Sequence, residues 1–303
     1  LAPLTVFLSL GLVVAPGRAQ PADCPQEVEA ATVNGTALHY IECGEGEPLI
    51  FVHGSLGSFQ AFGPQIEPFA ENYRVLAYSR RFYPPNVRPE EGDRYLMDRE
   101  VADLAALIEK LGAAPAHLVG NSYGAYVALV TAIRHPDLVQ TLVLGEAPVL
   151  VILERTKVGH AVHSSWNRRV LDPTKAAFKN GSAEEAVRTF FNGVLGPGEF
   201  DQFPAEMRRE MVSRMAPVFR MEMLAEPPAY MPAIGCETFG TLHPPTLLIT
   251  GEQSPTTLVL VNAHLEQCME GEAHVMIPEA GHVMQQDNPS AFNEAVRAFL
   301  EDQ

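Results

Sequence analysis

Basic residues are scarce in this chain of 303 residues, which has 21 lysines and arginines against 37 aspartates and glutamates. The resulting formal net charge of -16 repels phosphate backbones and argues against nucleic acid as a partner. The body of the sequence has no apolar run long enough to span a membrane. It also has no glycine-rich phosphate loop, dinucleotide-binding fingerprint or zinc-ligand spacing, so no cofactor or metal is implied. With 47% hydrophobic residues, the composition is typical of a globular protein.

The amino terminus differs from this body in its composition. Residues 4–15 are apolar and are followed by Pro16-Gly17-Arg18-Ala19, in which small residues at 17 and 19 suit cleavage by signal peptidase. We interpret residues 1–19 as a secretory signal and expect a periplasmic or secreted protein with no membrane attachment after cleavage. A buried amino-terminal helix is the alternative interpretation.

Cysteine is rare too, with four residues, which in an exported chain allow three disulfide connectivities. Asn34-Gly35 lies between two runs of strand character and is a strong signal for a two-residue hairpin. This register places Cys24 and Cys43 diagonally at the open end of the hairpin and favours a bridge between them. Cys236 and Cys268 would then form the second pair. Free buried thiols are the alternative.

Short apolar runs alternate with segments of helical periodicity along most of the chain. Expected strands are residues 27–33, 36–42, 48–52, 74–78, 116–119, 141–144, 246–250 and 273–277, and expected helices include 97–111, 125–133 and a last one opened by Asn288-Pro289, with Phe292, Val296 and Phe299 on one face. This alternation predicts βαβ units and a mostly parallel sheet. From residue 147 the rhythm breaks into Met-, Pro- and aromatic-rich helical pieces, one with a capping box at residues 182–185. We interpret them as an inserted cap.

Gly120-Asn121-Ser122-Tyr123-Gly124 has the spacing Gly-x-Ser-x-Gly between an expected strand and an expected helix. A sharp turn at such a junction brings backbone segments too close for side chains, which explains the glycines, and it exposes the serine hydroxyl. The motif alone is weak because glycine and serine are common. Its position makes Ser122 a candidate nucleophile.

Three motifs in order, the His53-Gly54 turn, the Ser122 elbow and the late Gly281-His282, make the chain resemble the α/β-hydrolase superfamily over residues 27–301. The resemblance implies an α/β fold with a mostly parallel, eight-stranded sheet whose first hairpin is antiparallel. It also implies a helical cap inserted after strand six. We therefore expect a hydrolase core of residues 20–146 and 241–303, and a cap of residues 147–240.

The same resemblance suggests the catalytic roles. Ser122 would be the nucleophile, and His282, after the strand at residues 273–277, would be the base that removes its proton. The backbone amides of Ser55 and Tyr123 would form the oxyanion hole. Leu56 would line the pocket or support the turn, and the His53 side chain would be structural.

The third catalytic residue departs from the family pattern. Many relatives have an Asp in a run like Gly-Glu-x-Asp-Pro, where this chain has Gly251-Glu252-Gln253-Ser254-Pro255. A neutral serine hydroxyl does not stabilise imidazolium as a carboxylate does. We favour Glu146, after the strand at residues 141–144, as in haloalkane dehalogenases and zearalenone-type lactonases, which carry an acid after strand six. Glu252 is the alternative acid, and a cap-anchoring ion pair is the alternative role for Glu146.

A serine nucleophile indicates acyl transfer, and hydrolysis of an ester or lactone is the simplest reaction. The apolar cap, including Trp166, favours a small or medium hydrophobic substrate. His163 is a candidate for pocket lining or cap surface, and Arg80 and Arg81 would bind a substrate carboxylate or form structural salt bridges. A carbon–carbon bond hydrolase or cofactor-free perhydrolase would use the same machinery. A catalytically dead binding protein is the alternative of a different class, and the oligomeric state is not predicted.

Overall fold

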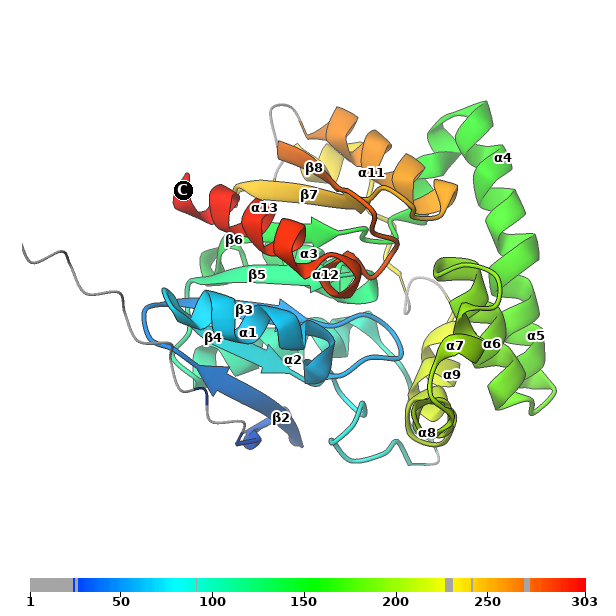
Figure 1. The fold of residues 1–303 in the computed structure, drawn as a ribbon, viewed down its shortest axis with the longest axis horizontal. Helices are drawn as coiled ribbons and strands as arrows, with labels where there is room; N and C mark the ends of the chain where they lie inside the picture. Colours follow the sequence, from blue (N-terminus) through cyan, green and yellow to red (C-terminus); the bar gives the residue numbers. More distant parts are fainter. Residues whose placement is uncertain (1–23, 25–26, 91, 227–230, 241, 270–272) are drawn as a thin grey trace, which may run out of the picture.

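A computed structural model describes residues 24, 27–90, 92–226, 231–240, 242–269 and 273–303. Its centre is one eight-stranded sheet with helices on both faces (Figure 1). The strands are β1 (Glu29–Val33), β2 (Thr36–Cys43), β3 (Glu47–Val52), β4 (Tyr73–Tyr78), β5 (Ala116–Asn121), β6 (Val139–Gly145), β7 (Thr246–Gly251) and β8 (Ala273–Ile277). They lie in the order β1-β2-β4-β3-β5-β6-β7-β8. Among the described residues, the β1–β2 and β2–β4 pairs are antiparallel and the other neighbouring pairs are parallel. This mostly parallel sheet confirms the predicted fold class.

Two apolar layers hold the helices against the sheet. The helices that pack on the sheet are α1 (Gly63–Ala70), α2 (Met97–Lys110), α3 (Tyr123–Arg134), α11 (Thr256–Cys268) and α13 (Pro289–Glu301), with the short α10 (Cys236–Phe239) and α12 (Met284–Asp287) beside them. Leu104 of α2, Leu129 of α3 and Leu265 of α11 belong to one core cluster. Phe69 of α1 and Phe292 of α13 belong to the cluster on the opposite face. The central strands β5, β6 and β7 are therefore buried on both sides, as their continuous apolar runs require, whereas the edge strands β1 and β8 are partly exposed.

Two expected helix starts have different outcomes. α13 begins as predicted, because the Asn288 side chain accepts a hydrogen bond from the Ala291 amide at 3.2 Å. The capping box expected at Ser182 is wrong, since its side chain makes no cap hydrogen bond to α6 (Ala183–Val194). The Ser182 backbone amide instead donates to the Ala177 carbonyl in a tight turn, and its ψ of 72° is not the extended value that a capping serine needs.

Between β6 and β7 the chain forms a group of helices beyond the carboxyl ends of the strands (Figure 1). They are the 3-10 helix η3 (Leu150–Arg155), α4 (Lys157–Trp166), the π-helical turn η4 (Asn167–Leu171), α5 (Asp172–Lys179), α6, α7 (Glu199–Gln202), α8 (Ala205–Glu210), the π-helical turn η5 (Met211–Met215) and α9 (Ala216–Leu224). We refer to residues 150–224 as the cap helices. The division of the chain into a core and a cap domain stays a prediction.

Both expected disulfides are present, Cys24–Cys43 and Cys236–Cys268. The first joins the segment before β1 to the end of β2, beside the predicted hairpin. The second joins α10 to the end of α11. Among the described residues, no helix combines the length and apolar character needed to cross a membrane. The predicted secretory signal at residues 1–19 lies outside the described residues.

Arg80, just after β4, is completely buried and lies between two helices that each contribute a carboxylate. One guanidinium nitrogen is 2.9 Å from Glu222 of α9, and another is 3.4 Å from Glu100 of α2. The neighbouring Arg81 pairs with Asp103 of α2, at 2.5 Å. In this structure both arginines therefore form the structural salt bridges that were the alternative to binding a substrate carboxylate. The ion pair between Arg80 and Glu222 thus attaches the helix α9 to the sheet.

The pKa of Glu100 is expected to make stability depend on pH. Burial, opposed by the charge of Arg80, raises this pKa from 4.5 to about 7. Between these values the folded protein binds more protons than the unfolded chain, so stability falls as the pH rises through the window. We expect Glu100→Gln to abolish this pH-dependent decrease in the free energy of unfolding, which is at most about 3 kcal/mol. Urea unfolding of both proteins at pH 5, 6, 7 and 8 measures it, and parallel pH profiles would contradict the assignment.

Candidate active site

Ser122 lies at the junction of β5 and α3 in a backbone conformation that side chains rarely adopt. Its φ is 54° and its ψ is -127°, and the residue is half-buried. A Cβ atom on Gly124 would lie 2.1 Å from the Val52 carbonyl oxygen, and one on Gly120 would lie 2.5 Å from the backbone of α3. Only glycine fits at both positions, which is the physical reason for the Gly-x-Ser-x-Gly spacing.

Glu146 and His282 form a buried pair at the same end of the sheet. Glu146 follows β6 with a φ of 51° and has no exposed surface, and His282 is 5% exposed. One carboxylate oxygen lies 2.6 Å from Nδ1 of His282, and the other accepts a hydrogen bond from the Gly251 amide at 3.0 Å. A carboxylate only accepts, so Nδ1 carries the proton and Nε2 is left as the basic nitrogen.

The alternative acid has a different environment. Glu252 is exposed, and its carboxylate accepts a hydrogen bond from the Glu279 amide at 2.9 Å. Ser254, at the position where many relatives have the acid, has a buried hydroxyl without a partner in the described part of the chain. Of the two carboxylates weighed from the sequence, Glu146 is the one in contact with His282.

Asn121 is a site residue that the sequence analysis did not assign, although it stands inside the motif. Its side-chain amide donates to the carbonyl of His282 at 3.0 Å and approaches that of Gly145 at 3.4 Å. The Ser122 amide also donates to Gly145, at 2.7 Å. The strand end that carries Ser122 is thus bonded both to the end of β6 and to the loop that carries His282. Only the folded arrangement of these loops reveals this role.

The His53-Gly54 turn lies beside the elbow. Burial, with the nearby charge of Arg80, lowers the pKa of His53 well below its usual value, so its ring is neutral. Nδ1 donates to the Gly54 carbonyl at 2.7 Å and Nε2 accepts from the Arg80 amide at 2.9 Å. These bonds use both ring nitrogens and make His53 structural. Ser55 follows in this turn, and Tyr123 is the first residue of α3, where the helix dipole favours negative charge.

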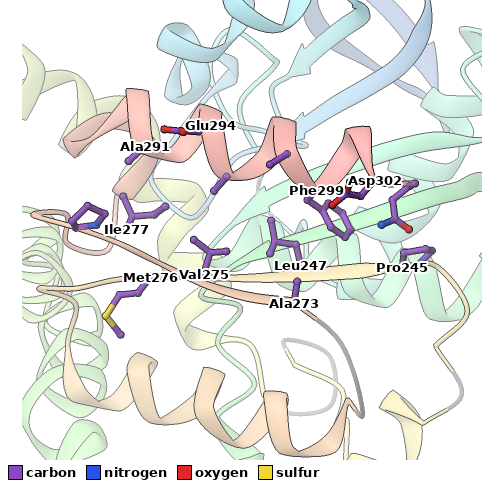
Figure 2. Close-up of a pocket in the computed structure, with 14 residues that line it drawn as sticks. Pro245, Leu247, Ala273, Val275, Met276, Ile277, Ala291, Glu294, Phe299 and Asp302 are labelled. Atoms are coloured by element: carbon purple, nitrogen blue, oxygen red, sulfur yellow. The ribbon is translucent and has the colours of Figure 1, made fainter.

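Two cavities meet at these residues and share the same five lining side chains. The shared residues are Ser55, Ser122, His282, Phe190 and Val194. The outer cavity has a volume of about 780 Å³ and includes Leu56 in its lining. The inner cavity has a volume of about 330 Å³ and includes Trp166 and His163. A third hollow, between β8 and α13, contains none of these residues (Figure 2).

The two histidines of α4 have one common partner. His160 and His163 both bond through Nδ1 to the carboxylate of Glu154. These hydrogen bonds lower the pKa of Glu154 below its usual value. The two histidines thus share the Glu154 carboxylate, which lines the inner cavity. Lys175 is another charged residue in this lining.

Comparison with known proteins identifies a family and several relatives. A family model described as alpha/beta hydrolase fold matches residues 47–289. The chain is 25% identical over 277 residues to the serine hydrolase BPHL of Mus musculus, covering 89% of this chain and 84% of the relative. It is 26% identical over 289 residues to epoxide hydrolase 3 of Mus musculus, covering 89% and 75%.

A third relative is the (E)-2-((N-methylformamido)methylene)succinate hydrolase of Acinetobacter baylyi, 23% identical over 88% of this chain and 95% of the relative. Among solved structures, an N-acyl homoserine lactone degrading enzyme superposes with a TM-score of 0.71 at 23% identity, over 89% of this chain and all of the other. A meta-cleavage product hydrolase gives a TM-score of 0.66 at 21% identity, over 91% and 98%. The family model covers most of the chain, and the chain therefore belongs to the α/β-hydrolase family.

Proposed function

We propose that the protein is a serine hydrolase that cleaves a small or medium hydrophobic ester or lactone through an acyl-enzyme. Ser122 is the nucleophile, His282 the general base, and Glu146 the acid that orients it. The observation that carries the proposal is the buried contact of 2.6 Å between Glu146 and Nδ1 of His282, at the rim of the cavities that Ser122 lines. This is the pairing by which a carboxylate stabilises imidazolium in serine hydrolases.

In the first half-reaction, the Ser122 oxygen attacks the substrate carbonyl while its proton moves to Nε2 of His282. The amides of Ser55 and Tyr123 bind the oxygen that becomes negative in the tetrahedral intermediate. Collapse of this intermediate breaks the bond to the leaving alcohol, which takes the proton from His282. An acyl-enzyme on Ser122 remains.

In the second half-reaction, water takes the place of the alcohol. His282 accepts a proton from the attacking water, and the carbonyl carbon passes through a second tetrahedral intermediate. The bond to Ser122 then breaks, and His282 returns the proton to the serine oxygen. The products are a carboxylic acid and an alcohol, or one hydroxy acid when the substrate is a lactone.

The two cavities support a substrate with two unequal parts. The inner cavity of about 330 Å³ is mainly apolar, with Tyr126, Leu150 and Met223 among its lining residues, and suits one compact hydrophobic group. The outer cavity of about 780 Å³ also takes in polar residues such as Gln60 and Glu210. The susceptible carbonyl would lie where the cavities meet at Ser122.

Carbon–carbon bond hydrolysis is the second candidate reaction, because one of the structures similar to this chain is described as a meta-cleavage product hydrolase. The Ser122 and His282 machinery would serve such a reaction or perhydrolysis equally well. A panel of short-chain esters, lactones, amides and a meta-cleavage product separates these reactions. Activity that disappears in Ser122→Ala assigns the reaction class.

A fluorophosphonate probe tests whether the protein is an enzyme at all. We expect rapid labelling of the wild type, because an activated serine attacks phosphorus as it attacks a carbonyl. The matched control is Ser122→Ala, which should not be labelled. Labelling is read by intact-protein mass spectrometry. An unlabelled wild type with a native circular-dichroism spectrum would favour a catalytically dead binding protein.

The choice of acid is tested by two isosteric substitutions. Glu146→Gln removes the charge that stabilises protonated His282 and should lower kcat by about 10³-fold or more. Glu252→Gln removes an equal charge from the neighbouring loop and should leave kcat unchanged. Steady-state kinetics with the best ester of the panel measure both variants. The opposite ranking would assign the acid to Glu252.

Trp166→Ala tests the role of the inner cavity. Trp166 lines this cavity and is mostly buried, so its truncation should admit longer acyl groups. We expect the ratio of kcat/KM for a long-chain over a short-chain ester to rise by about tenfold. A series of p-nitrophenyl esters, assayed well below the melting temperature, measures this ratio. An equal decrease for every chain length would indicate damage to the fold instead.

A further inference from the structure

The turn that carries Ser55 is fixed at four successive residues by side chains from elsewhere in the fold. The Arg80 guanidinium donates to the carbonyls of His53 at 3.0 Å and Gly54 at 3.3 Å. The Leu56 amide donates to the Tyr83 hydroxyl at 3.3 Å. The fourth bond comes from the Ser55 hydroxyl. The Ser55 amide itself makes no hydrogen bond within the described part of the chain, so it is left to bind an oxyanion.

The acceptor of the Ser55 hydroxyl is a carboxylate from a distant part of the sequence. Glu222 has no exposed surface and lies in the last turn of the cap helix α9. One oxygen accepts the Ser55 hydroxyl at 2.6 Å, and the other lies 2.9 Å from the Arg80 guanidinium. A charged acceptor at such a short distance gives a strong hydrogen bond. Arg80 holds the Glu222 carboxylate in place, and this carboxylate in turn holds the Ser55 side chain.

We propose that Glu222 is a positioning residue for catalysis, which holds the Ser55 side chain and so aims the Ser55 amide at the reacting carbonyl. This inference rests on the proposed function, because the Ser55 amide binds an oxyanion only if the protein is a serine hydrolase. Oxyanion donors contribute to rate only when they are directed before the reaction, because reorientation during the step costs energy. Without the hydrogen bond from Ser55 to Glu222, the turn would still carry the Ser55 amide as a donor. The amide would no longer be held in position before the reaction.

The contact also makes the oxyanion hole depend on the cap helices. Arg80 and Ser55 belong to loops at the carboxyl ends of β4 and β3, whereas Glu222 is contributed by α9. The complete set of bonds on the turn therefore forms only when α9 is docked on the sheet. The cap would thus position the catalytic donor in addition to lining the substrate cavities.

The test is Ser55→Ala, which deletes the hydroxyl and keeps both the backbone amide and the Arg80–Glu222 pair. We expect kcat to fall about tenfold, less than the 10²- to 10³-fold loss for deleting a donor. KM should stay within about twofold of the wild type, because the bond acts on the transition state. The rate of labelling by the fluorophosphonate should fall in parallel. A purely structural contact would change the melting temperature and leave kcat as it is.

Two further variants serve as controls. Ser58→Ala removes a hydroxyl that caps the next turn of the same loop and does not touch Glu222, so kcat should be unchanged. Ser55→Thr retains a hydroxyl for Glu222 and should recover most of the lost rate. If Ser55→Ala does not fold, Ser55→Cys, whose thiol is a weaker donor, replaces it with the same expected direction.

The outcomes separate the two proposals. Wild-type protein that is not labelled contradicts the serine hydrolase assignment before any variant is compared. If the wild type is active and Ser55→Ala has the same kcat, the positioning role of Glu222 is overturned while the proposed function stands. A loss of kcat in Ser55→Ala that Ser55→Thr restores and Ser58→Ala does not share supports the positioning role.

Discussion

The positive charge of Arg80, held without any exposed surface, is the constraint on which much of this structure depends. A buried guanidinium is costly unless carboxylates and hydrogen-bond acceptors surround it. The sequence supplies Glu100 from α2, Glu222 from α9 and the carbonyls of the turn after β3. The rings of Tyr83 and Tyr123 lie about 5 Å from the guanidinium carbon and add cation–π contacts. Satisfying one cation thus brings together a core helix, a cap helix, the turn with Ser55 and the start of α3.

The acid beside His282 illustrates how a parallel sheet allows one charge to come from different strands. The ends of β6 and β7 are neighbours, so a carboxylate after either strand lies at the same edge of the sheet. Here Glu146 comes from β6, and the end of β7 contributes the Gly251 amide that bonds its second oxygen. The carboxylate after β6 lies 2.6 Å from Nδ1 of His282.

Backbone strain is concentrated in the same region. Six described residues other than glycine have a positive φ, and three of them, Leu56, Ser122 and Glu279, line the outer cavity. A fourth, Glu146, contacts His282. Each such conformation costs of the order of 1–3 kcal/mol and persists only where its surroundings determine it. The hydrogen bonds of Asn121 and the packing of Gly124 against β3 are the restraints at the elbow.

The sequence by itself determined the individual strands and the hairpin that favours the first disulfide, because periodicity and turn chemistry act over a few residues. The arrangement of the sheet and the proposed roles of Ser122 and His282 came from the resemblance to the α/β-hydrolase superfamily. The sequence narrowed the acid to Glu146 or Glu252 and left Arg80 with two possible fates, since neither choice is local. Only the tertiary structure decided which carboxylate contacts His282, and only it revealed Asn121 and Glu222, whose partners lie 161 and 167 residues away. Contacts over such separations depend on how strand ends and helices converge in three dimensions. No pattern within a short stretch of sequence encodes that convergence.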